Sequence, residues 1–300
     1  MILFARPSYI VYRGYSNCGR GPNHFTTSWK VSTDMVFTIA KLNRISKEQR
    51  DCLFLQLIPE SLFSKLSIDP VTLTNRYGEC VVQGFFPYDE NFACIEVKSR
   101  LKDNDLTFYC QISLDTFMNS VYLDFVGIID PLSDRFNVDI DECGKDTLFG
   151  SQSRNIKEEI KAMEAGLAPG MVRRGMRLLG EFMKSLERFT LSLGLNTISL
   201  GALYYHNAIQ WERYGFNYFK GGKLMKRINE EFQPKGLLYQ KLDDSSPFRR
   251  RGMDRTVRGR SWAIYDGILA EAFGEDWEAP KMYKMVGKDY NVNTFPDHIY

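Results

Sequence analysis

The chain has 300 residues, of which 44% are hydrophobic and 14% aromatic, so it can form one large or two ordinary domains with substantial cores. Its formal net charge is only +2, which gives no global electrostatic argument for a nucleic-acid partner. No run of 18 apolar residues occurs, and this predicts that no segment spans a membrane.

The cysteines and histidines argue against a metal centre. The six cysteines contain no CxxC pair and there are only three histidines, so a zinc site is not expected. The opening MILFARPSYIVYRG lacks a basic leader and a small-residue cleavage site, and is predicted to form a strand. Together with cysteines expected to be reduced thiols, these features predict a cytoplasmic protein.

The N-terminal segment alternates short strands with loops. A strand is predicted over residues 9–13 and ends at Arg13, and a glycine-rich loop follows it. A second short strand, FTTSW, contains Thr27 and Ser28. Ser32 or Thr33 can cap the helix that comes next.

Three further elements complete the first ninety residues. The continuous apolar run CLFLQLI (52–58) predicts a buried strand, and PESLFSKL predicts a helix with proline at its start. GECVVQGF then predicts a strand headed by Glu79.

Three strands are predicted in series in the middle of the chain. They are FACIEVK (92–98), LTFYCQISL (106–114) and VYLDFVGIID (121–130). Short connections join them, which favours an antiparallel meander. The third strand carries two carboxylates, Asp124 and Asp130.

Residues 131–170 are predicted to be an excursion from this sheet. FNVDIDECGKD has the alternating acidic residues of a calcium loop, but not the glycine and the closing glutamate that an EF-hand needs. A strand that ends in a turn at Gly144 is predicted instead, followed by a helix over residues 154–166.

A basic turn then precedes a long amphipathic helix. The turn contains Arg173, Arg174 and Gly175. From Leu178 onward the apolar residues follow helical spacing, at positions 178, 179, 182, 183, 186, 189 and 193. A helix N-terminus offers unpaired N–H groups and partial positive charge, so this turn is a candidate phosphate site.

A strand, a short helix and another strand follow the long helix. TISLGAL predicts the first strand, residues 206–214 have room for about two helical turns, and FNYF predicts the second strand. Tyr214-Gly-Phe connects the short helix to the last strand.

The C-terminal segment begins with a cluster of arginines. The six are Arg249, Arg250, Arg251, Arg255, Arg258 and Arg260. A solvated loop balanced by nearby acids is the favoured interpretation, and nucleic acid or another anionic partner is the alternative. An acidic helix is predicted over residues 265–278.

Between about residues 90 and 220 the chain resembles the GNAT family of N-acetyltransferases. The shared order is a meander, a basic turn, a long helix, a strand, a short helix ending in Tyr-Gly-Phe, and a closing strand. The resemblance implies an α/β (α+β) fold with a mixed, mainly antiparallel sheet flanked by helices. It also implies that Arg173, Arg174 and Gly175 hold the pyrophosphate of acetyl-CoA or a longer acyl-CoA.

The same resemblance suggests catalytic residues and shows departures from the family. Tyr214 would be the general acid, and Asp124 or Asp130 the base. Arg177 and Leu179 stand where the family usually has two small residues. Trp211 stands where a proton-donating tyrosine is often found, and the segment over 131–170 interrupts the usual passage into the loop.

Residues 8–86 resemble ADP-ribosyltransferases of the Arg–Ser–Glu type. The resemblance implies that Arg13 and Ser28, with Thr27 beside them, would bind NAD, and that Glu79 would stabilise the positive charge that develops as nicotinamide leaves. Tyr77 replaces the second acidic or glutamine residue often found two positions before the glutamate.

The sequence therefore predicts three regions: a β-rich N-terminal domain (1–88), a GNAT-like domain (89–242), and an arginine-rich loop with a helical extension (243–300). An alternative makes 45–220 one acetyltransferase-like domain whose first helices lie in 46–66. The predicted function is transfer of an acyl group from acyl-CoA to an amine on a small molecule or protein. The alternatives are NAD-dependent ADP-ribosyl transfer and a non-enzymatic binding or assembly role.

Overall fold

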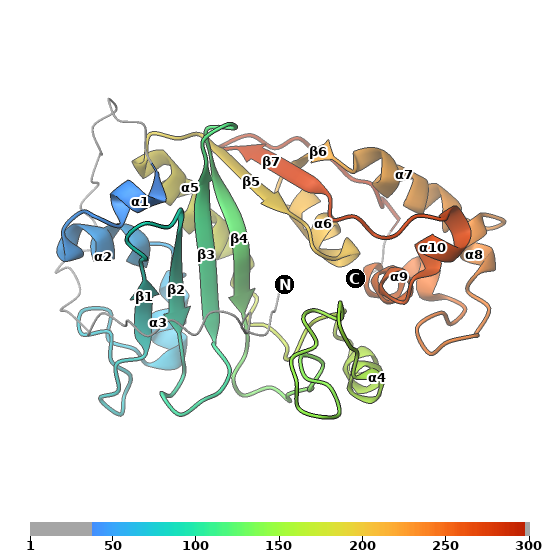
Figure 1. The fold of residues 1–300 in the computed structure, drawn as a ribbon, viewed down its shortest axis with the longest axis horizontal. Coiled ribbons are helices and arrows are strands. Elements are labelled where there is room, and N and C mark those ends of the chain that lie inside the picture. The colour runs from blue at the N-terminus through green and yellow to red at the C-terminus, as the bar shows by residue number, and fades with distance from the viewer. Residues whose placement is uncertain (1–37, 298–300) are drawn as a thin grey trace. The chain divides into compact units, whose positions relative to one another are not determined.

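The computed structural model describes residues 38–297, in which helices flank a sheet of seven strands. The strands lie in the order β1-β2-β3-β4-β5-β7-β6 (Figure 1). The expected mixed α/β fold with a mainly antiparallel sheet is confirmed. The chain divides into two compact units, and each unit combines segments that are distant in the sequence.

The first unit is built on an antiparallel meander. It contains the described residues up to Ser133, together with Gly175–Ser199 and Met285–Gly287. Its four meander strands, which pair in chain order, are β1 (Val82–Phe85), β2 (Phe92–Val97), β3 (Phe108–Asp115) and β4 (Ser120–Ile128). The short connections between the strands permit only this antiparallel arrangement, as the sequence predicts. β5 (Thr197–Gly201) is the next strand in the sheet order.

Four helices belong to the described part of the first unit, and the longest packs against β3 and β4. They are α1 (Ile39–Leu42), α2 (Lys47–Leu55), α3 (Glu60–Leu66) and α5 (Leu179–Ser192). Phe182 of α5 contacts Phe108 with ring centroids 6.0 Å apart, and Phe189 contacts Phe54 at 5.5 Å. The apolar stripe predicted for the long helix is therefore its buried face.

The predicted strand over residues 52–58 is wrong, because α2 and the turn after it occupy this segment. Ser46 caps the helix by accepting a hydrogen bond from the backbone N–H of Gln49 at 3.3 Å. A continuous apolar run is compatible with a buried helix end as well as a buried strand. The helices of the alternative acetyltransferase-like domain, expected in residues 46–66, are present as α2 and α3.

The second unit is mainly helical, with two paired strands. It contains residues 134–174, 200–284 and 288 onward. Its helices are α4 (Ile156–Glu164), α6 (Tyr205–Glu212), α7 (Gly222–Glu231), α8 (Leu237–Gln240), a 3-10 helix (Met253–Arg255), α9 (Val257–Tyr265) and α10 (Ile268–Phe273). β6 (Asn217–Lys220) pairs antiparallel with β7 (Lys281–Met285).

The C-terminal arginine cluster is only in part the solvated loop that the sequence favours. Arg249 is 8% exposed, and its guanidinium binds the carboxylates of Asp266 (2.9 Å) and Glu271 (2.5 Å). Arg260 is 2% exposed, and its guanidinium lies over the ring of Phe295. The expected balance by nearby acids holds for Arg249, for Arg250 with Glu164 and for Arg251 with Asp244. Four of the six arginines are exposed as expected, and the other two are buried in the helical core.

The cysteines differ from expectation at one position. Cys52, Cys94, Cys110 and Cys143 are free thiols, whereas Cys80 takes part in a disulfide bond. The expectation that the thiols are reduced is therefore wrong at Cys80.

Candidate functional site

Asp124 occupies an irregular position in the sheet of the first unit. Gln111 of β3 pairs with Phe125 and Ile112 pairs with Leu123, so Asp124 is an extra residue without a partner across the ladder. A bulge of this kind bends the strand and redirects a side chain, and bulges are frequent beside active sites.

The carboxyl group of Asp124 is only partly satisfied. Ser113 Oγ donates a hydrogen bond to Asp124 Oδ1 at 3.2 Å, while Oδ2 is buried and has no hydrogen-bond partner. Loss of solvation disfavours the charged form, and this burial raises the pKa of Asp124 to about 7. The group can therefore gain and lose a proton near neutral pH.

Other polar groups of β2 and β3 are also withheld from water. Tyr109 Oη donates to Gln111 Oε1 at 2.7 Å and lies 3.4 Å from Cys94 Sγ. Burial raises the pKa of both Tyr109 and Cys110, so these side chains stay neutral where Asp124 titrates.

The start of α5 lies in the same unit as Asp124. Arg177 is exposed and has φ +60°, a left-handed conformation that glycine adopts far more readily than arginine. Leu178 precedes the helix and provides no side-chain cap. The first N–H groups of α5 therefore have no side-chain acceptor from the cap residue, and they carry the partial positive charge of the helix end. Glu181 is bonded elsewhere, because its Oε1 accepts from the backbone N–H of Ser61 at 2.8 Å.

The predicted pyrophosphate residues are divided between the units. Arg173 is half-buried and Arg174 is exposed, and both belong to the second unit. Arg174 Nη2 donates to the carbonyl oxygen of Ala165 at 3.2 Å, across the end of α4. Gly175 begins the segment that returns to the first unit and leads into α5.

Tyr214 lies directly after α6 in the second unit. Its ring packs beside Trp211, with centroids 6.4 Å apart, and its carbonyl oxygen accepts from Lys284 Nζ at 2.7 Å. Burial raises the pKa of the Tyr214 hydroxyl, which keeps it protonated. Trp211 is fully buried and belongs to the core.

The remaining predicted residues are placed as follows. Glu79 lies in a turn before β1, where Arg100 Nε donates to its carboxylate at 2.9 Å and Asn75 Nδ2 at 2.8 Å. The Arg100 hydrogen bond lowers the pKa of Glu79. Asp130 Oδ1 accepts from the backbone N–H of Leu132 in the turn after β4. The predicted NAD residues Arg13, Thr27 and Ser28 lie outside the described residues.

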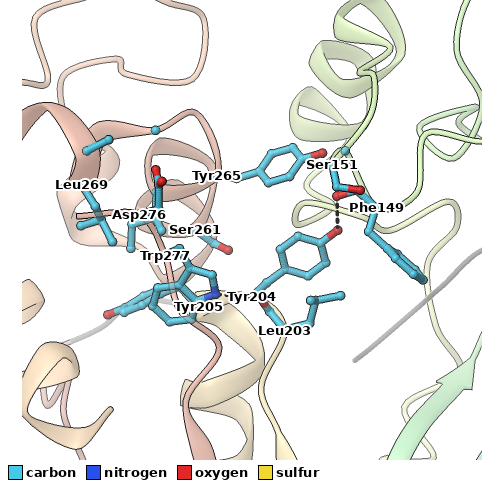
Figure 2. Close-up of a pocket in the computed structure, with 14 residues that line it drawn as sticks. Phe149, Ser151, Leu203, Tyr204, Tyr205, Ser261, Tyr265, Leu269, Asp276 and Trp277 are labelled. Atoms are coloured by element: carbon cyan, nitrogen blue, oxygen red, sulfur yellow. Dashed lines mark hydrogen bonds between the residues drawn. The ribbon is translucent and has the colours of Figure 1, made fainter. Parts of the chain in front are cut away.

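The second unit contains a cavity that the sequence does not reveal. Its volume is about 250 Å³ (Figure 2). Its lining comes from the loop at residues 149–151, from residues 203–205, and from residues of α9, α10 and the segment after α10. Tyr204, Tyr205, Tyr265 and Trp277 provide most of the aromatic lining. These residues come from distant parts of the sequence, so only the tertiary fold brings them together.

A buried histidine lies next to this cavity. His206 Nδ1 is 2.9 Å from Ser261 Oγ, which links α6 to α9. Burial lowers the pKa of His206 well below its ordinary value, so the imidazole is neutral at neutral pH. Both side chains are almost fully buried, and the pair satisfies two polar groups within the packed core.

Comparison of the sequence and the structure with protein families, curated proteins and solved structures finds no match. Among residues 38–297, no three histidine, cysteine or acidic side chains are grouped so as to hold a metal ion. None of the helices described is both long enough and apolar enough to cross a membrane.

Proposed function

We propose that this protein is an N-acyltransferase that uses acetyl-CoA or a longer acyl-CoA and an amine acceptor, with Asp124 as the general base. The observation that carries this proposal is the bulged, largely buried Asp124 carboxyl, whose pKa of about 7 is matched to proton transfer at neutral pH. It lies on β4, which precedes α4 and the long helix α5 in the chain.

The start of α5 supports the coenzyme A part of the proposal. The GNAT resemblance puts Arg177 where the family has a small residue, and here the backbone has the left-handed conformation that suits glycine. Because the Arg177 side chain is exposed, its charge can meet a phosphate without filling the space at the helix end. The N–H groups at the start of α5 would provide the remaining donors. Arg173, Arg174 and Gly175 precede them in the chain.

The proposed chemistry requires one proton acceptor and one proton donor. Asp124 takes a proton from the ammonium form of the acceptor, which frees the nitrogen lone pair. The nitrogen then attacks the carbonyl carbon of the thioester, and the carbon–sulfur bond breaks. The nitrogen loses its second proton as the amide forms, and a proton taken from water neutralises the leaving thiolate. Tyr214, whose raised pKa keeps its hydroxyl protonated, belongs to the other unit, and its role as general acid stays a prediction.

No observation on residues 38–297 favours the ADP-ribosyltransferase alternative. The carboxylate of Glu79 is occupied by Arg100 and Asn75. The acyltransferase proposal includes a cytoplasmic setting and an amine acceptor that is a small molecule or a protein. If the protein does not transfer acyl groups, a non-enzymatic binding or assembly role is favoured instead.

The test compares two carboxylates of one region, Asp124 within β4 and Asp130 just after it. Acetyl-CoA is incubated with a panel of primary amines, and acetylated product is measured by mass spectrometry. Asp124→Asn should lower kcat by about 100-fold or more, because general-base catalysis contributes at least that much. Asp130→Asn should leave kcat nearly unchanged, because that carboxylate serves a turn. Equal effects of the two substitutions would exclude Asp124 as the base.

A further inference from the structure

The aromatic cavity of the second unit has walls made of two perpendicular ring pairs. Tyr204 and Tyr265 meet edge to face with centroids 5.6 Å apart, and Tyr205 and Trp277 do so at 6.2 Å (Figure 2). Within each pair the two rings do not stack flat, although Tyr204 stacks on His206 with centroids 5.6 Å apart and the Arg154 guanidinium lies over the Tyr265 ring. A guest can therefore meet Trp277 and the ring faces that these neighbours leave open. A volume of about 250 Å³ is several times the share of one water molecule, about 30 Å³, and accommodates a small organic molecule.

Four of the side-chain donors that line the cavity are already used within the protein, whereas the buried Tyr205 hydroxyl has no hydrogen-bond partner. Tyr204 Oη donates to the carbonyl oxygen of Phe149 at 3.3 Å, and Trp277 Nε1 donates to that of Leu203 at 2.7 Å. Two further lining hydroxyls have similar internal partners. Tyr265 Oη is 3.4 Å from Glu159 Oε1, and Ser151 Oγ donates to the carbonyl oxygen of Leu148 at 2.6 Å.

These internal bonds decide which chemistry the cavity can recognise. An anion needs N–H or O–H donors, and among the lining side chains only Tyr205 keeps a hydroxyl that is not used within the protein. What the aromatic walls still offer is the negative face of their π-systems, which attracts a cation. The Ser261 hydroxyl is hydrogen-bonded to His206, so it is not an additional donor for an anion.

Asp276 adds a full negative charge to the same lining. It is exposed, lines the cavity beside Trp277, and has no ion-pair partner within the described part of the chain. The neighbouring carboxylates Glu275 and Glu278 are paired with Arg227 and Lys220. Among these three acids, Asp276 is therefore the one that both lines the cavity and remains available to a ligand.

We propose that this cavity is a binding site for a small organic ammonium ion, held by the faces of Trp277 and the tyrosines and by the Asp276 carboxylate. Cation–π attraction and a nearby carboxylate act together on an ammonium head group whose substituents fill the aromatic lining. The site lies within one compact unit and does not rest on the proposed acyltransferase activity.

The test uses choline and its neutral isostere 3,3-dimethylbutan-1-ol as probes, titrated calorimetrically into the whole protein without acyl-CoA. Choline should bind about tenfold more tightly than the isostere, which has the same shape without the charge. Asp276→Asn should weaken choline binding severalfold, while Glu275→Gln, a matched change next to it in the chain, should have no effect. Trp277→Leu should weaken binding more than Trp277→Phe, which keeps an aromatic face.

Thermal unfolding of each variant shows whether it is folded. If Trp277→Leu does not fold, Trp277→Phe still tests the role of the Trp277 ring. The proposal is overturned if the isostere binds as well as choline, if choline does not bind, or if Glu275→Gln and Asp276→Asn have equal effects. Because acyl-CoA is left out, these outcomes are distinct from failure of the acyl-transfer reaction.

Discussion

At Asp124, one extra residue in β4 changes the chemistry of a carboxyl group. The sequence identifies this aspartate as a candidate base, but the alternating pattern of residues 121–130 contains no sign of a bulge. The raised pKa depends on burial and on a single hydrogen bond from Ser113, and both are properties of the folded sheet. For this reason the sequence could identify Asp124 as a candidate base but could not predict the raised pKa of its carboxyl group.

The raised pKa of Asp124 predicts a pH-dependent cost to stability. Its folded-state pKa of about 7 exceeds the unfolded value near 3.9, so the free energy of unfolding should fall as pH rises from about 4 to about 7. Asp124→Asn does not titrate and should gain roughly 2–4 kcal/mol relative to wild type between about pH 4 and pH 8. Urea unfolding at several pH values measures this difference. An unchanged difference across the range would mean that Asp124 titrates normally.

Arg177 offers a second test at the scale of one residue. A side chain in the left-handed region costs about 1 kcal/mol, so Arg177→Gly should raise the free energy of unfolding by up to about that amount. Lys184→Gly is the matched control, because Lys184 is exposed within α5, where glycine should destabilise by about 0.5–1 kcal/mol. Denaturant unfolding of both variants should give opposite signs. Two losses of stability would contradict the strained conformation.

At the scale of elements, the sequence predicts the meander, α4, α5, α6 and the strands on either side of α6. These elements have strong periodicity or clear end signals. The strand predicted in place of the end of α2 is wrong. The buried end of this helix (Leu53, Phe54 and Leu55) has the continuous apolar character of a buried strand. The signal that could have identified it is Ser46 followed three residues later by Gln49, the pattern of a helix start.

Ionic contacts on α4 predict two very different mutational effects. Glu159 is 1% exposed and receives hydrogen bonds from Arg154, which also pairs with Asp266. Glu159→Ala leaves a largely buried guanidinium short of a partner and should cost about 3–5 kcal/mol. Lys157→Ala removes a surface pair with Glu142 and should cost less than about 1 kcal/mol. Chemical denaturation measures both, and similar losses would contradict a structural role for the buried pair.

At the scale of the whole molecule, tertiary structure determines what the sequence cannot. The last strand, β7, lies between β5 and β6 in the sheet order, although it follows both in the chain. Each compact unit likewise collects segments from separate parts of the sequence, and so does the aromatic cavity. The boundaries near residues 88 and 242, drawn from successive elements, stay predictions.

The central claim is that the start of α5 binds acyl-CoA, and calorimetric titration with acetyl-CoA tests it most directly. We expect one site per chain, with affinity that Arg177→Glu lowers by about tenfold or more, since reversing this charge turns attraction to phosphate into repulsion. Arg188→Glu makes the same charge change at an exposed position near the other end of α5 and should have little effect. Absence of binding to the wild-type protein, or equal weakening by the two substitutions, would contradict the proposal.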